Sequence, residues 1–270
     1  MYVRLIFFFC CVLFFSKPVF SSGDDYLVGG RSFGLANASV MLTDYWSLFN
    51  NQAGLAFLNT TQAGIHHNRG MVKQLNHQAI GVVLPTKTGN IGGSCSYFGF
   101  SKFHEVKAGL AYAMLLEEKL AAGVQLDYFY THIDGYYGNA HSVAAEIGII
   151  YEPFENIILG THIFNPFQLA ELGSVEKMPM VFRFGTGYQV QDNLLLTAEY
   201  ELDLDEKACF KAGLEHELVE DFYIRAGILT NPVINSFGVG YVWNKLTFDV
   251  SFSRHFILGY SPQFSLNYSF

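Results

Sequence analysis

The feature that most constrains this chain is an alternation of apolar and polar residues that recurs in short segments up to its last residue. In residues 194–202, Leu, Leu, Ala, Tyr and Leu occupy every second position, and the polar Thr197, Glu199 and Glu201 lie among the positions between them. Residues 246–253 repeat this pattern. Because successive side chains of a strand point to opposite faces, each segment has one apolar and one polar surface. The pattern predicts amphipathic strands.

Segments of this kind fill the chain from about residue 61 to its end. A membrane strand takes about 10 residues at the tilt of a barrel, and fourteen strands with connections of about five residues would fill this length. An even number is typical of a single-chain bacterial barrel, and twelve remain if the weaker early segments are not strands. The predicted strands centre on residues 63–68, 75–84, 91–100, 106–115, 120–131, 142–151, 157–164, 180–189, 193–202, 207–215, 222–229, 237–243, 246–253 and 263–270.

A soluble β-sandwich also alternates, with its apolar face turned to the partner sheet. Composition favours a membrane barrel instead. Aromatic residues make up 16% of the chain and charged residues only 15%, against roughly 25% charged in ordinary soluble domains. Tyr200, Tyr241 and Trp243 stand at predicted strand ends, where membrane barrels carry aromatic girdles. We therefore expect an all-β fold, a transmembrane antiparallel β-barrel.

The first 22 residues are typical of a cleaved signal peptide. Arg4 is followed by the apolar stretch from Leu5 to Phe15, and small residues stand near Ser22. This stretch is too short for a transmembrane helix, which takes about 20 residues. The expected division is a signal peptide (1–22), an N-terminal hatch or plug segment (23–60) and a barrel (61–270). The net charge of −8 becomes more negative after cleavage, which argues against nucleic acid as a partner.

The C-terminus resembles the signal that outer-membrane barrels present to their assembly machinery. Aromatic or aliphatic residues occupy every second position up to the end, namely Phe264, Leu266, Tyr268 and Phe270. Together with the signal peptide, this predicts the outer membrane of a Gram-negative bacterium as the location. The expected partners are outer-membrane lipid and, during biogenesis, the barrel assembly machinery.

If the apolar faces contact lipid, the polar faces line the lumen. Charges there are costly to bury unless they are paired or hydrated. Two interpretations stay open: the charges form ladders that fix the wall, or some of them line a permeation path. The predicted lumen residues are Gln125, Asp127, Glu146, Arg183, Glu199, Glu201, Lys211, Glu215, Arg225 and Asp249.

Sequence motifs for catalysis or metal binding are not found. The chain has no GxSxG, no P-loop, no HExxH and no Cys–His metal spacing. Ser253 and His255 share a face, which we attribute to chance, whereas His141 and Ser142 must lie on opposite faces. We expect no enzyme activity, no metal and no cofactor, and we expect the nine histidines to be solvated or in loops. Cys95 and Cys209 are interpreted as isolated thiols, with a disulfide as the alternative.

Residues 23–60 are irregular and rich in small residues, which allow close approach of the backbone. A segment like this, directly ahead of a barrel, suits a plug in the lumen; the alternative is a periplasmic tail. The predicted hatch residues are Gly30, Arg31, Gly34, Asp44, Asn51, Gln52, Ala53 and Gly54.

This segment resembles the FadL family of outer-membrane transporters for long-chain fatty acids and hydrocarbons, and the PorV and PorQ proteins of type IX secretion in Bacteroidetes-type bacteria. The resemblance lies in Gly30-Arg31, Gly34, Ala36, Ala38, Asp44, Ser47 and Asn51-Gln52-Ala53-Gly54-Leu55. It implies an N-terminal hatch followed by a fourteen-stranded barrel. Gln52 replaces the proline of the family, which removes a fixed φ, and the chain is much shorter than fatty-acid transporters.

The primary hypothesis is a passive uptake channel for a small or hydrophobic solute, gated by the hatch. Release would be lateral through the wall or downward into the periplasm. The alternative hypothesis is a non-transporting PorV/PorQ-like barrel that holds secretion-system subunits or cargo at the cell surface. A soluble secreted sandwich or a lipase is disfavoured.

Overall fold

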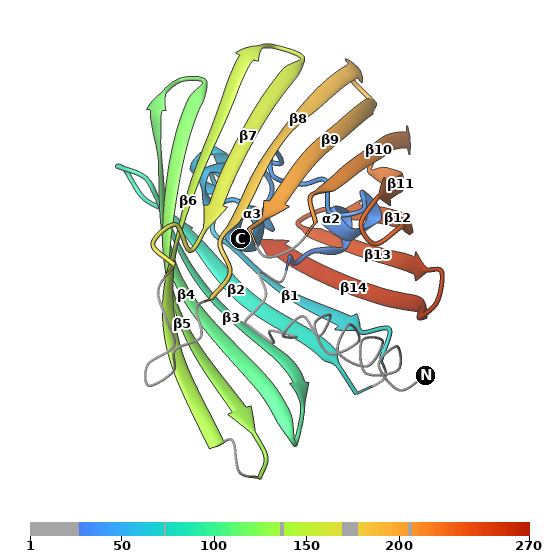
Figure 1. Ribbon diagram of the computed structural model, residues 1–270. Coiled ribbons are helices and arrows are strands. Elements are labelled where there is room, and N and C mark those ends of the chain that lie inside the picture. Colours follow the sequence, from blue (N-terminus) through green and yellow to red (C-terminus); the bar gives the residue numbers. More distant parts are fainter. Residues whose placement is uncertain (1–26, 73, 136–137, 169–177, 205–206) are drawn as a thin grey trace, which may run out of the picture.

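Fourteen strands form one closed antiparallel barrel in which each strand pairs with its neighbours in sequence and β1 pairs with β14 (Figure 1). The structure is a computed structural model and describes residues 27–270 apart from 73, 136–137, 169–177 and 205–206. The predicted signal peptide lies outside the described residues. The closed antiparallel barrel confirms the predicted fold class, and the count is fourteen rather than twelve.

All fourteen predicted segments are strands, and several run longer than their predicted centres. The strands are β1 (Gln62–Arg69), β2 (Asn76–Pro85), β3 (Asn90–Phe100), β4 (Phe103–Glu117), β5 (Leu120–Ile133), β6 (Gly138–Phe154), β7 (Ile157–Phe164), β8 (Val181–Gln191), β9 (Leu194–Asp203), β10 (Cys209–Val219), β11 (Phe222–Leu229), β12 (Ile234–Trp243), β13 (Leu246–His255) and β14 (Gly259–Ser269).

The two ends of the barrel differ in their connections. At the end where β1 begins and β14 finishes, five turns have two residues and the β2–β3 turn has four. The opposite end has the longest connection, residues 165–180. Membrane barrels have short periplasmic turns and longer extracellular loops, so we assign the end that carries Phe270 to the periplasm. The expected average of five residues per connection thus conceals tight hairpins and one long segment.

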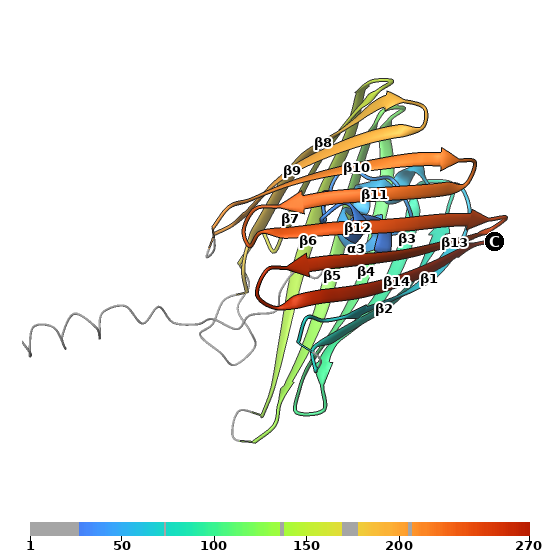
Figure 2. The same cartoon turned by 90° about the vertical axis from the view of Figure 1, so that its right-hand side faces the viewer.

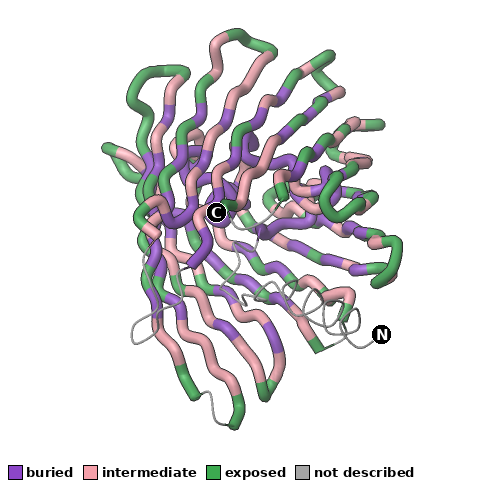
Figure 3. The backbone as a smooth tube through the Cα atoms, in the orientation of Figure 1, coloured by how far each residue is buried: buried purple, intermediate pink, exposed green. Residues whose placement is uncertain are grey.

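Burial alternates along the strands, as the sequence pattern predicts (Figure 3). Large apolar side chains such as Leu110, Leu126 and Phe210 face outward and are 65%, 70% and 60% exposed. The residues that alternate with them point into the barrel, and Gln125, Asp127 and Lys211 among them are buried. A closed barrel with an apolar outside and a polar inside is suited to span a membrane. None of the helices in the described part of the chain is long and apolar enough to cross a membrane.

Residues 27–58, which we call the hatch segment, lie inside the ring of strands (Figures 1 and 2). The segment contains the short helices α2 (Gly30–Gly34) and α3 (Ser47–Asn50) and the 3₁₀ helix η1 (Gln52–Phe57). Helices this short are not stable alone, so contact with the wall must hold them. Helix α2 contacts β11–β14 and η1 contacts β3–β6, so the segment reaches from one wall to the opposite one.

Candidate functional site

The hatch segment lies directly against glycines on the inner wall of the barrel. Inward-facing glycines stand opposite each other in neighbouring strands, and a Cβ on any of them would meet a hatch atom. Tyr45 lies against Gly64, for example, and the backbone of Gln52 and Ala53 lies against Gly123. The absence of side chains lets the hatch backbone approach the wall closely. The four facing pairs, here called the glycine seats, are Gly64–Gly81, Gly123–Gly148, Gly160–Gly185 and Gly213–Gly227.

The sequence carries a signal for these seats that the motif search missed. The glycines occupy polar-face positions of the alternating strands, where the expected residue is polar. Glycine in the interior of a strand weakens it and often marks the close approach of another backbone. Its recurrence at inward positions of several strands therefore indicates a body inside the barrel.

Three clusters of charged residues attach the hatch segment to the wall between these seats. The first, the Arg31 cluster, consists of Arg31, Asp44, Glu215, Arg225 and Asp249. Arg31 donates two hydrogen bonds to the carboxylate of Glu215, at 2.8 and 2.6 Å, and a third to Asp44 at 3.0 Å. Arg225 on β11 bridges Glu215 and Asp249, with its Nη1 2.6 Å from Asp249 Oδ1. Such bidentate, charge-assisted contacts fix position as well as charge.

The second group, the Glu199 cluster, consists of Glu199, Glu201 and Lys211 on β9 and β10. One carboxylate oxygen of Glu199 accepts hydrogen bonds from the backbone N–H groups of Ser39 and Val40, both at 2.8 Å. The other oxygen accepts from Lys211 Nζ at 2.9 Å. Lys211 also reaches Glu201, whose side chain is 28% exposed. This cluster therefore holds the middle of the hatch segment by its backbone.

The third group, the Glu146 cluster, consists of Lys107, Asp127, Glu146, His162 and Arg183 on β4–β8. Glu146 accepts hydrogen bonds from Gln52 Nε2 at 2.6 Å and from Lys107. It also lies 2.9 Å from His162 Nε2. Arg183 donates to the carbonyl of Asn50 at 2.6 Å. The end of α3 and the start of η1 are thus bound to the wall by both a side chain and a backbone carbonyl.

The Asn51-Gln52-Ala53-Gly54 motif lies at this third attachment. Asn51 Nδ2 donates to the carbonyl of Val40 at 2.6 Å, and Asn51 Oδ1 accepts from Ala53 N–H at 3.2 Å. Gln52 begins η1, where a proline would have had no side-chain donor for Glu146. A Cβ on Gly54 would overlap the side chain of Ser47. The departure from proline therefore coincides with a hydrogen bond to the wall.

The structure places the predicted lumen residues on the inner face of the wall. Nine are buried, and Glu201 is partly exposed. Gln125 joins the Glu146 cluster through hydrogen bonds to Asp127 at 2.9 Å and to Glu146 at 3.3 Å.

Of the predicted hatch residues, Arg31, Asp44, Asn51 and Gln52 make the polar contacts described above, and Gly30 donates to Ser265 Oγ at 2.9 Å. Gly34 packs against Arg225 and Gly238. Phe264, Tyr268 and Phe270 point outward.

The expectation that the histidines are solvated or in loops is wrong for three of them. His66, His77 and His162 are at most 3% exposed and lie on the inner face. His66 stacks on Phe33 of the hatch segment, with ring centroids 5.7 Å apart. Polar-face positions become buried here because the hatch segment fills the lumen, which the strand pattern alone does not reveal.

Ser253 and His255, which share a face, hydrogen-bond to other groups in the structure. Ser253 Oγ bonds to Ser236 Oγ at 3.1 Å, while His255 Nδ1 accepts from the backbone of residues 257 and 258. No group of three or more His, Cys, Asp or Glu able to hold a metal occurs among the described residues. Cys95 and Cys209 are both free thiols, the first exposed and the second buried.

A polar cavity of about 290 Å³ lies beside the Arg31 cluster at the periplasmic end. Arg31, Asp44 and Trp46 line it from the hatch, and Gln62, Thr247 and Ser269 line it from the strand ends. At the extracellular side of the Glu146 cluster, an apolar group consists of Phe129, Ala144, Phe164, Met178 and Val181. The hatch segment thus has a polar chamber on its periplasmic side and apolar side chains on its extracellular side.

No protein-family model matches this sequence, and no curated protein matches it. Solved structures do. CymD, a monoaromatic hydrocarbon channel, has a TM-score of 0.68 at 12% identity, covering 90% of this chain and 97% of that chain. The toluene transporter TbuX of Ralstonia pickettii has a TM-score of 0.69 at 12% identity, and the match covers 90% of this chain and 98% of TbuX. A FadL homologue of Pseudomonas aeruginosa has a TM-score of 0.67 at 12% identity, and the match covers 93% of this chain and 99% of the homologue.

At these identities the likeness concerns architecture. The matches cover 90–93% of this chain and 97–99% of the other chains. The chain has the fold of FadL-like outer-membrane barrels.

Proposed function

We propose that this protein is an outer-membrane channel for passive uptake of a small apolar or aromatic solute, and that the hatch segment closes it. The observation that carries the proposal is the position of residues 27–58, which cross the lumen and bind opposite walls. A barrel with a purely structural role would need no separate segment bound by several independent attachments.

The chemistry of the extracellular side favours an apolar or aromatic solute. Phe129 and Phe164 face the lumen there, and the ammonium of Lys107 lies 5.6 and 5.3 Å from their ring centroids. The two rings pack edge to face on each other and are buried, so an aromatic solute would stack on them or meet them edge to face once the side chains that cover them move. The similar structures include channels named for monoaromatic hydrocarbons and for toluene, which agrees with this solute class.

We infer that release is downward, into the periplasm. Register shifts in the barrel occur between β4 and β5, β6 and β7, β8 and β9, and β10 and β11, each next to a two-residue periplasmic turn. The other strand pairs keep an uninterrupted register, including those between β14, β1, β2 and β3. The polar cavity beside the Arg31 cluster supports a route at the periplasmic end. No described contact favours the alternative role as an accessory of type IX secretion.

A reversible cross-link tests the proposal. Ala36 of the hatch lies in one buried apolar cluster with Cys209 and Leu229 of the wall, so the variant Ala36→Cys places a second thiol near the native one. We expect uptake of radiolabelled toluene by cells that carry this variant to fall to the level of cells without the protein under oxidising conditions. Reduction with dithiothreitol should restore uptake.

The control is the same variant with Cys209→Ser, which cannot form the link and should transport under both conditions. A mobility shift on non-reducing gels, or cross-linking with dibromobimane, verifies that the link forms. Unchanged uptake with the link formed would contradict hatch gating. Wild-type uptake no greater than that of cells without the protein would contradict transport of this solute class.

A further inference from the structure

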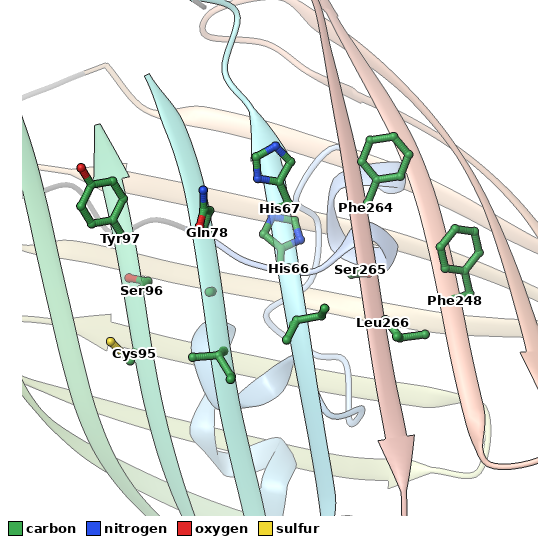
Figure 4. Close-up of a pocket in the computed structure, with 13 residues that line it drawn as sticks. His66, His67, Gln78, Cys95, Ser96, Tyr97, Phe248, Phe264, Ser265 and Leu266 are labelled. Atoms are coloured by element: carbon green, nitrogen blue, oxygen red, sulfur yellow. The ribbon is translucent and has the colours of Figure 1, made fainter. Parts of the chain in front are cut away.

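The outward face of β14, β1, β2 and β3 is hollowed (Figure 4). Two adjoining hollows of about 650 and 600 Å³ share Ile65, Ile80, Cys95 and Leu266, and together we call them the outer groove. Each has the size of a typical small-molecule site. Because the register between these strands is uninterrupted, the outer groove lies on the lipid side of the wall and is separate from the lumen.

The strand register orders the residues of the outer groove into three rows. The row nearest the extracellular end is Phe264, His67, Gln78 and Tyr97, and Figure 4 shows these side chains at one level across the four strands. The next row towards the periplasm is Leu266, Ile65, Ile80 and Cys95. The third is Tyr268, Ala63, Val82 and Gly93. The first row is polar in three of its four positions, and the two below it are apolar apart from the phenol of Tyr268.

Small residues explain why the surface is hollow here. Ala63, Cys95 and Gly93 have little or no side chain on the outward face. A Cβ on Gly93 would have only one neighbour, Val82 Cγ1 at 3.9 Å, so open space lies above it. Tyr268 stands opposite Ala63, and Phe264 and Phe248 line the groove from β14 and β13. All three are more than a third exposed. Large rings beside a floor of small residues form a groove with walls.

We propose that the outer groove binds a lipid of the outer leaflet. One acyl chain lies over Ile65, Ile80 and Gly93, and the headgroup hydrogen-bonds to His67, Gln78 and Tyr97. The orientation supports this occupant, because the polar row is at the extracellular end, where outer-leaflet headgroups lie. A lipid of the inner leaflet would meet the polar row with its chain ends. The proposal rests only on the barrel spanning the membrane and is independent of solute uptake.

Native mass spectrometry of the full protein in detergent, titrated with lipid A as the outer-leaflet lipid, tests the proposal. We expect an adduct of one lipid at low lipid concentration. The variant Gly93→Phe fills the groove and should weaken this adduct at least tenfold, and His67→Leu should weaken it several-fold by removing a headgroup contact. Ala198→Phe is the matched control, because Ala198 is a small, exposed, outward residue of β9; it should bind lipid like the wild type.

The variant Ala63→Phe fills the same groove and replaces Gly93→Phe if that protein does not fold. Equal lipid binding by the groove-filled variants and by Ala198→Phe would overturn the proposal. An adduct with the mass of a second protein chain in place of a lipid would also overturn it. Gly93→Phe should leave toluene uptake unchanged, so that loss of lipid binding and failure of the uptake channel give different results.

Discussion

Replacing Gly123 with leucine is expected to displace the hatch segment from the wall. A side chain at this seat would occupy the space of the backbone of Gln52 and Ala53, and backbone atoms cannot rotate away as a side-chain end can. Overpacking of this kind costs about 1–3 kcal/mol or more. The expected result is a lower free energy of unfolding in detergent micelles, with cleavage of residues 27–58 by an added protease that leaves the wild type intact.

The same substitution in a barrel that lacks residues 27–58 isolates the contact with the hatch. There the new side chain projects into empty lumen, and we expect it to leave the free energy of unfolding unchanged. Gly93→Leu is the control on the outward face, where a Cβ meets only Val82 at 3.9 Å. If Gly123→Leu destabilised both backgrounds equally, the glycine seats would serve the wall alone, and our account of them would be wrong.

The second large effect is expected from Arg225→Met in the Arg31 cluster. Arg225 is 6% exposed and bridges the carboxylates of Glu215 and Asp249. Its removal leaves Arg31 as the only cation of the cluster beside three carboxylates. Removing one partner of a buried ion pair costs about 3–5 kcal/mol because the remaining charge stays buried. We expect a loss of this size in urea unfolding, together with more frequent channel openings, since Glu215 also holds Arg31 of the hatch.

A compensating change separates charge from packing. In the double variant Arg225→Met/Asp249→Asn one of the uncompensated carboxylates is gone, so part of the lost stability should return. Arg254→Met is the control, because Arg254 is exposed on the outer face and stacks on Tyr260; it should change stability little. A double variant less stable than Arg225→Met would show that the cluster is not held by charge balance.

Strand positions and their faces could be predicted because they depend on a period of two that is local in sequence. The alternation in residues 194–202 places Glu199 inside and Leu196 outside, and the structure agrees. Hairpin neighbours follow from the same pattern, because each strand pairs with the next.

The attachments of the hatch segment could not be predicted, because they join residues that are distant in sequence. Arg31 and Glu215 are 184 positions apart, and nothing local to either residue specifies the other. The burial of His66 likewise depends on Phe33 and Trp46, which reach it only when the hatch segment enters the barrel. The Asn51-Gln52-Ala53-Gly54 motif indicated where to look, but its contact with Glu146 depends on the barrel register.

The central claim is that residues 27–58 close a lumen that otherwise conducts. Single-channel recording in planar bilayers, with the refolded protein and with the protein lacking residues 27–58, tests it most directly. The account predicts brief or no openings for the complete protein and stable, larger conductance steps once the segment is removed. Equal conductance of the two proteins, or no conductance from either, would show that the segment does not close a channel, and the claim would be wrong.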